Sequence, residues 1–157
     1  MTRAVVPQIL KAATGRGWTI TTAESCTGGM VAAALTDVSG ASEMFQRGFV
    51  TYSNAAKSDM LGVRPATLET YGAVSEPVVH EMAEGARRAA GADIAVAISG
   101  IAGPGGSDTK PEGRVCYAIA TAAGVSTQTI DHGALGRDAV RRAARDYALD
   151  MILAVLR

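Results

Sequence analysis

The segment from residue 23 to residue 29, AESCTGG, places a serine where it could act as a nucleophile. A short β-branched run ends just before Ser25, and an apolar helical stripe begins at Met30. These patterns predict a strand, a tight turn and a helix. The first N–H groups of a helix lack partners within it, so they can hold an oxyanion or another anion near the serine. A plain helix cap explains the same residues equally well.

The residues after this serine are candidate substrate contacts. Gly28 and Gly29 permit a close approach of the backbone, and Thr27 adds a hydroxyl beside them. Cys26 competes with Ser25 as the nucleophile, but adjacent side chains in such a turn diverge, and a small buried thiol is the common outcome. We therefore expect Ser25, and not Cys26, to be the nucleophile.

A second group of reactive side chains lies at another predicted junction of strand and helix, in the segment YSNAAK from Tyr52 to Lys57. A neutral lysine could accept the proton of a serine hydroxyl, provided that burial or a cationic neighbour lowers its pKa. Lysine is rare in this chain, because Lys57 is one of only three beside twelve arginines. The alternative is an ordinary surface lysine exposed to solvent, which is the more frequent case for lysine.

The loop from Gly100 to Gly113 is rich in glycine and follows an apolar run that predicts a buried strand. Such a loop can surround a ligand with backbone groups, although it fits neither the GxxxxGK[ST] nor the GxGxxG fingerprint of phosphate sites. A flexible surface loop is the alternative. Arg137, at the start of the predicted last helix, is well placed to hold a phosphate. We expect Arg141, Arg142 and Arg145 to form a solvated face.

No group of His, Cys, Asp and Glu residues has the spacing of a metal site, so we expect no metal and no cofactor. His80 and His132 have no spaced partner and are predicted to be structural. Cys26 and Cys116 lie far apart and indicate a reducing compartment, for which we expect the cytoplasm. The first residues lack the apolar core of a signal peptide, and no apolar run is long enough for a membrane span, so we expect no membrane partner.

These groups need elements to position them, and the pattern predicts alternating helices and strands. The predicted helices cover residues 5–13, 30–35, 54–61, 75–90 and 137–156, and the predicted strands cover residues 18–23, 45–52, 93–99, 115–122 and 125–130. A turn at Ala123-Gly124 predicts an antiparallel hairpin, which makes the sheet mixed. The order of elements predicts the α/β class: a single three-layer α/β/α domain over residues 1–157, without a predicted strand order.

Composition excludes some classes of protein. The chain has 157 residues, which suits one domain, and 48% of them are hydrophobic, which suffices for an aliphatic core. Fifteen basic and fifteen acidic residues cancel, which argues against a nucleic-acid partner held by a strong basic field. The expected partner is a small molecule. We also expect a homo-oligomer, in the simplest case a dimer, although no motif specifies one.

Three segments together resemble the CinA C-terminal family, including its stand-alone nicotinamide-nucleotide amidohydrolases. They are TTAESCTGGMVAAALTDVSGAS, FVTYSNAAKSDMLGV followed by GAVSEPVV, and ISGIAGPGG followed by KPEG. The resemblance covers nearly the whole chain. It implies an α/β/α domain that hydrolyses nicotinamide mononucleotide to nicotinate mononucleotide and ammonia in pyridine nucleotide recycling.

The resemblance also implies roles for five side chains. Ser25 would be the nucleophile, Lys57 its base, and Tyr52 a proton relay or hydrogen-bond partner. Ser99 and Arg137 would contact the nucleotide. A non-catalytic nucleotide-binding or competence-associated partner protein of the same fold is the alternative, but that hypothesis does not require the three catalytic side chains to occur together.

Overall fold

The computed structural model describes residues 2–157, which form a five-stranded sheet with the strand order β2-β1-β3-β4-β5. The strands are β1 (Ile20–Glu24), β2 (Phe49–Val50), β3 (Ile94–Gly100), β4 (Arg114–Thr121) and β5 (Gly124–Asp131). Strand β1 pairs in parallel with β2 and β3, whereas β4 runs antiparallel to both β3 and β5. The predicted mixed sheet and its terminal hairpin are therefore confirmed.

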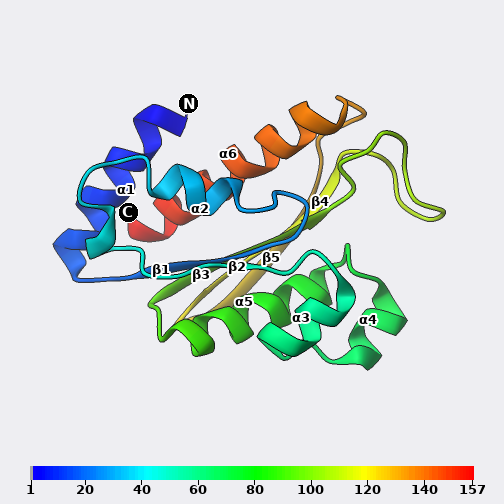
Figure 1. The fold of residues 1–157 in the computed structure, drawn as a ribbon, viewed down its shortest axis with the longest axis horizontal. Coiled ribbons are helices and arrows are strands. Elements are labelled where there is room, and N and C mark those ends of the chain that lie inside the picture. Colours follow the sequence, from blue (N-terminus) through cyan, green and yellow to red (C-terminus); the bar gives the residue numbers. More distant parts are fainter. Residues whose placement is uncertain (1) are drawn as a thin grey trace.

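Helices cover both faces of the sheet, as Figure 1 shows. One face carries α1 (Thr2–Arg16), α2 (Met30–Leu35) and α6 (Arg137–Leu156), and the other carries α3 (Asn54–Leu61), α4 (Pro65–Tyr71) and α5 (Glu76–Ala90). A short 3₁₀ helix, η1 (Ala41–Glu43), follows α2. The predicted three-layer α/β/α arrangement is confirmed.

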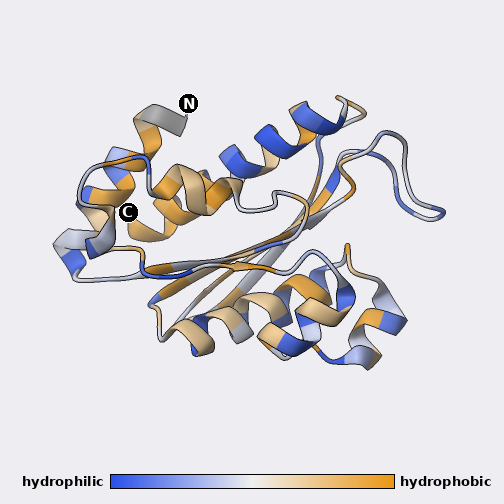
Figure 2. Cartoon of the chain, in the orientation of Figure 1, coloured by the Kyte–Doolittle hydropathy of each residue, from blue (hydrophilic) through white to orange (hydrophobic). Residues whose placement is uncertain are grey.

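The three inner strands β1, β3 and β4 are buried because each helical layer turns an apolar stripe toward them, whereas the edge strands β2 and β5 are partly exposed. Strand β3 is buried from Ile94 to Ser99, which fits the apolar run that predicted it. The second half of α6 is mostly hydrophobic and packs in the core beside α1, whereas its first half is mostly hydrophilic (Figure 2). The polar first half is the part of α6 that begins with Arg137 and reaches the candidate site.

Two local expectations differ from the structure. The predicted strand over residues 45–52 is wrong for most of its length, since only Phe49–Val50 forms a strand and Phe45 makes an isolated bridge. This segment lies at the sheet edge with β1 as its neighbour, and its carbonyls at Thr51 and Tyr52 turn to Lys57 instead of to another strand. Helix α4 was not predicted; it is only seven residues long and depends on packing against α5.

Candidate active site

Ser25 lies directly after β1, at the edge of the sheet where the parallel strands β1 and β3 both end. Its N–H donates to the carbonyl of Ile98 at 3.0 Å, so the serine is held by the sheet's own hydrogen bonding. Ser99, near the end of β3, is buried at the same edge. Ligands of α/β proteins commonly bind outside the carboxyl ends of parallel strands, and this arrangement places two hydroxyl groups there.

The turn after Ser25 is built around the buried carboxylate of Glu24. This carboxylate accepts hydrogen bonds from the Thr27 hydroxyl at 2.6 Å and from the N–H groups of Val31 and Ala32 at 2.9 and 3.0 Å. A carboxylate at a helix N-terminus is favoured by the unpaired N–H groups and the helix dipole. The expectation that first-turn N–H groups of α2 face a substrate is therefore wrong for these two groups, because Glu24 occupies them.

Lys57 reaches Ser25 from the opposite side, out of the first turn of α3. That helix begins where predicted, because the Ser53 side chain caps it by accepting a hydrogen bond from a backbone N–H at 3.0 Å. The Lys57 side chain is only 1% exposed, and its Nζ lies 3.0 Å from Ser25 Oγ. The same nitrogen donates to the carbonyls of Thr51 and Tyr52 at 2.8 and 3.2 Å. The lysine is thus aimed at the serine and is no surface residue.

Burial sets the protonation of the two groups next to Ser25. It lowers the pKa of Lys57 to about 8, because a charged ammonium is poorly stabilised away from water. It raises the pKa of the Cys26 thiol to about 11, so this thiol is protonated near neutral pH. Lys57 is therefore partly neutral at physiological pH, as a base must be. The prediction that Cys26 is buried is confirmed, since this residue is only 5% exposed.

A cavity of about 370 Å³ opens beside the serine. It lies between the end of the sheet, the Tyr52 region and the Gly100–Gly113 loop, and its lining includes Ser25, Lys57, Tyr52, Ser99, Arg137, Val74 and residues 100–107. The predicted convergence of the serine, the tyrosine and the lysine on one pocket is confirmed as geometry. The glycine-rich loop forms a wall of this cavity, as expected for a loop around a ligand.

Tyr52 and Arg137 form a pair at the mouth of the cavity. Tyr52 is 59% exposed, and its hydroxyl oxygen accepts a hydrogen bond from Arg137 Nη2 at 2.8 Å. Arg137 Nη1 donates to the carbonyl of Gly103 in the loop, also at 2.8 Å. The guanidinium is exposed, so it can meet a charged group that enters from solvent.

The three predicted substrate contacts after Cys26 lie outside the cavity. Thr27 is fully buried and its hydroxyl donates to Glu24, while Gly28 and Gly29 adopt positive φ angles of 58° and 106° that shape the turn. They are not among the residues that line the cavity. Their geometry favours a role in holding the Ser25 turn over direct contact with a ligand.

Arg141 was expected on a solvated face, and that expectation is wrong. It is half-buried, and its guanidinium donates to the carbonyl of Cys26 at 3.0 Å and to that of Thr27 at 3.3 Å. The spacing of one helical turn from Arg137 was the available signal for this position. Arg142, by contrast, is exposed and pairs with Asp138 on the helix surface. Arg141 therefore belongs to the support of the Ser25 turn.

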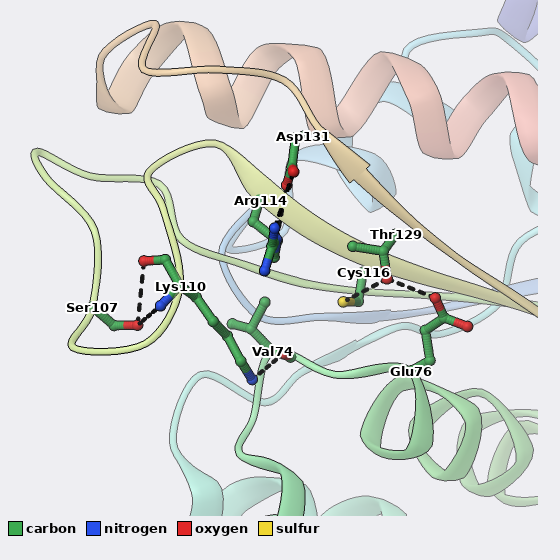
Figure 3. Close-up of polar contacts among 8 residues, drawn as sticks. All are labelled: Val74, Glu76, Ser107, Lys110, Arg114, Cys116, Thr129 and Asp131. Atoms are coloured by element: carbon green, nitrogen blue, oxygen red, sulfur yellow. Dashed lines mark hydrogen bonds and ion pairs between the residues drawn. The ribbon is translucent and has the colours of Figure 1, made fainter.

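Lys110 anchors the glycine-rich loop to the opposite wall of the cavity (Figure 3). Its ammonium donates to the carbonyl of Tyr71 at 3.0 Å and to that of Val74, both in or beside the connection between α4 and α5. Its backbone N–H donates to the Ser107 hydroxyl at 3.1 Å. The loop is therefore tied down near the cavity, which no sequence pattern had indicated for this lysine.

Residues 2–157 contain no helix that is long and apolar enough to cross a membrane. Within the same range no three His, Cys, Asp or Glu side chains gather closely enough to share a metal ion. Both cysteines are unpaired and buried.

Comparison with known proteins places this geometry in a family. The model of the CinA C-terminal domain matches residues 2–156. Nicotinamide-nucleotide amidohydrolase PncC of Escherichia coli strain K12 is 60% identical, over 94% of this chain and 88% of that protein. The crystal structure of competence/damage inducible protein CihA from Agrobacterium tumefaciens superposes with a TM-score of 0.96 at 44% identity, covering 99% of this chain and 96% of that one.

A second solved structure agrees with the first. The CinA superfamily protein KP700603 from Klebsiella pneumoniae 700603 has a TM-score of 0.95 at 41% identity and covers 99% of this chain and 98% of that one. The fold and the sequence therefore agree over nearly the full length of the chain, including all the segments that build the cavity. The chain belongs to the CinA C-terminal domain family.

Proposed function

We propose that this protein is a nicotinamide-nucleotide amidohydrolase, which hydrolyses nicotinamide mononucleotide to nicotinate mononucleotide and ammonia in pyridine nucleotide recycling. The observation that carries the proposal is the buried Lys57 amine 3.0 Å from the Ser25 hydroxyl in an open cavity. An amide needs a strong nucleophile and a proton for its leaving nitrogen, and this pair supplies both. The name of the Escherichia coli relative, at 60% identity, supports the substrate.

In the proposed reaction neutral Lys57 removes the proton of Ser25 as Oγ attacks the carboxamide carbon. Lys57 then gives that proton to the amide nitrogen, the C–N bond breaks, and ammonia leaves an ester on Ser25. Water attacks this ester with Lys57 again as the base, which releases the nicotinate product and restores the serine. Tyr52, which lines the same cavity, is proposed to assist through its hydroxyl.

Arg137 and Ser99 are proposed to bind the nucleotide. The exposed guanidinium at the mouth suits a phosphate, because it carries a permanent charge and a planar set of donors. Ser99 lies at the inner end of the cavity, near the reacting serine. The substrate would thus enter with its carboxamide inward and its phosphate outward.

The setting of the protein is part of the same proposal. We infer a cytoplasmic location, which the two unpaired cysteines support. Residues 1–157 are proposed to act as one domain with a small-molecule substrate and as a homo-oligomer. Packing of both helical layers on one shared sheet supports the single domain.

Release of ammonia from nicotinamide mononucleotide by the purified protein tests this function. We expect turnover by the unaltered protein, none by a folded Ser25→Ala variant, and no change on treatment with a chelator. Binding of the nucleotide without release of ammonia would instead favour the non-catalytic alternative. Activity that disappears with the chelator and returns with a divalent ion would contradict a mechanism that uses only serine and lysine.

A further inference from the structure

Glu112 joins two separate segments at the mouth of the cavity. Its Oε1 accepts a hydrogen bond from the N–H of Gly105 at 2.6 Å, and its Oε2 accepts one from the N–H of Gly136 at 2.9 Å. Gly105 belongs to the glycine-rich loop, and Gly136 is the residue immediately before α6. The loop and the start of α6 lie at the same end of the molecule in Figure 1. One carboxylate therefore connects two parts of the cavity wall that are about thirty residues apart in sequence.

These two hydrogen bonds belong to a closed ring that contains Arg137. Three hydrogen bonds close the ring: Gly136 N–H to Glu112, Arg137 Nη1 to the carbonyl of Gly103, and Gly105 N–H to Glu112. The backbone supplies the other links, from Gly136 to Arg137 and from Gly103 to Gly105. Glu112 makes no ion pair with Arg137 itself in the described residues, so it acts on the arginine through the backbone. Arginine has five N–H donors and two of them are used in these contacts, which leaves donors for an anion.

Packing and charge both favour this place for Glu112. The side chain lies against Gly103, where an added Cβ would come within 2.6 Å of the Glu112 carboxyl carbon. Gly103 also has a φ of 92°, a conformation that favours glycine. A carboxylate in front of α6 is stabilised by the positive end of the helix dipole. The loop backbone and the glutamate are thus fitted to one another.

We infer that Glu112 is a positioning residue that holds the Arg137 guanidinium where it meets the phosphate of the substrate. The inference rests on the proposed function for the identity of the substrate. Without the carboxylate, the N–H groups of Gly105 and Gly136 lose their acceptor, and the loop and the start of α6 are free to separate. Removal of the carboxylate should therefore weaken binding of the anion and leave the chemical step largely intact, because the Ser25 and Lys57 pair has no contact with Glu112.

Three variants with a matched control test the inference. Glu112→Ala removes both acceptors, and Glu112→Gln keeps a similar size but has one carbonyl oxygen where two are needed. Asp108→Asn is the control, because Asp108 is an exposed carboxylate in the same loop. The double variant Glu112→Ala with Arg137→Ala shows whether the two residues act together. Thermal melting identifies any variant that fails to fold.

Kinetics with nicotinamide mononucleotide give the first measurement. We expect Glu112→Ala to raise KM roughly tenfold and Glu112→Gln to raise it less, with kcat changed less than about threefold and the control unchanged. In the Arg137→Ala background, Glu112→Ala should add little to KM, because the residue through which it acts is already missing. An unchanged KM in a folded Glu112→Ala variant, or losses that multiply in the double variant, would overturn the inference.

Two measurements that need no turnover separate this inference from the proposed function. By NMR, amide hydrogen exchange at Gly105 and Gly136 should accelerate together in Glu112→Ala and stay unchanged in Asp108→Asn. Binding of inorganic phosphate should weaken in Glu112→Ala and in Arg137→Ala. If the unaltered protein releases no ammonia, the proposed function is wrong, and these two measurements alone then decide whether Glu112 positions an anion site.

Discussion

The Nζ of Lys57 lies 3.0 Å from the Oγ of Ser25, although 32 positions separate the two residues in the chain. One side chain comes from the turn after β1 and the other from the first turn of α3. Since Lys57 is almost completely buried, the contact is not screened by water. This contact is what the proposed chemistry depends on, and its consequences can be measured.

Removing either member of the pair should stop the reaction. We expect Ser25→Ala and Lys57→Ala each to lower kcat on the order of 10³-fold or more, because serine is a weak nucleophile while it keeps its proton. The double variant should be scarcely slower than either single variant, since the two groups act as a unit. Steady-state release of ammonia by folded protein is the measurement. Cys26→Ala is the matched control and should keep most of the activity; if it is the inactive variant, the nucleophile is assigned to the wrong residue.

The rate should follow the titration of Lys57. Only the neutral amine accepts a proton, and burial lowers the pKa of this group to about 8. The value of kcat/KM should therefore rise about tenfold per pH unit below pH 8 and level off above it. A pH profile from the unaltered protein checks this. A profile that is flat or that falls over the same range would mean that the neutral Lys57 is not the base.

Replacement of Arg137 should weaken binding more than chemistry. Arg137→Ala should raise KM by roughly tenfold to a hundredfold with a smaller effect on kcat, because the guanidinium at the mouth is proposed to contact the phosphate and not the carboxamide. Arg142→Ala is the control, since Arg142 lies on the same helix and pairs with Asp138 at the surface. A collapse of kcat at constant KM would place Arg137 in the chemical step instead.

Stability should fall in acid because of His132. Its Nε2 lies 2.6 Å from the hydroxyl of the fully buried Tyr117, and burial lowers the pKa of the histidine. The unfolded chain therefore binds a proton more readily than the folded one, so this histidine's contribution to stability is present above the unfolded pKa of about 6.5 and declines as pH falls below it. Urea unfolding between about pH 7.5 and pH 5 measures the effect.

The two histidines of the chain permit a matched comparison for this effect. His132→Gln keeps a hydrogen-bond acceptor for Tyr117 but has no group that titrates in this pH range. It should therefore reduce the pH dependence of the unfolding free energy. His80→Gln, which replaces the other histidine at the helix surface beside Glu84, is the comparison variant. Equal slopes in all three proteins would show that His132 is not the source.

Much of the fold follows from short-range patterns. Ser53 and Ser75 cap α3 and α5, and Gly62 and Gly91 end these helices in the left-handed conformation that glycine adopts most easily. Period and turn signals also predicted the β4–β5 hairpin and the bounds of α6. Such features depend on hydrogen bonds and dihedral angles within a few residues, so the sequence carries them directly. The segment around β2 was wrongly predicted as a longer strand, because the carbonyls of Thr51 and Tyr52 bond to the Lys57 side chain instead of to another strand.

For the site, the sequence by itself determined which reactive residue types exist and at which junctions of strand and helix they stand. It identified Ser25, Tyr52, Lys57 and Arg137, which the structure brings to one cavity. Tertiary structure alone decided that Lys57 is buried and therefore has a lowered pKa. Desolvation depends on what packs around a side chain, and no local pattern records this.

The contacts that support the site could also not be predicted from the sequence. Arg141 reaches the turn after Ser25 across 115 positions, Lys110 reaches the end of α4 across 39, and Glu112 reaches the start of α6 across 24. Each is a charged side chain of a type that usually lies at the surface. Its partner is a backbone group, which every residue type possesses, so only the folded arrangement of the chain selects which backbone group it meets.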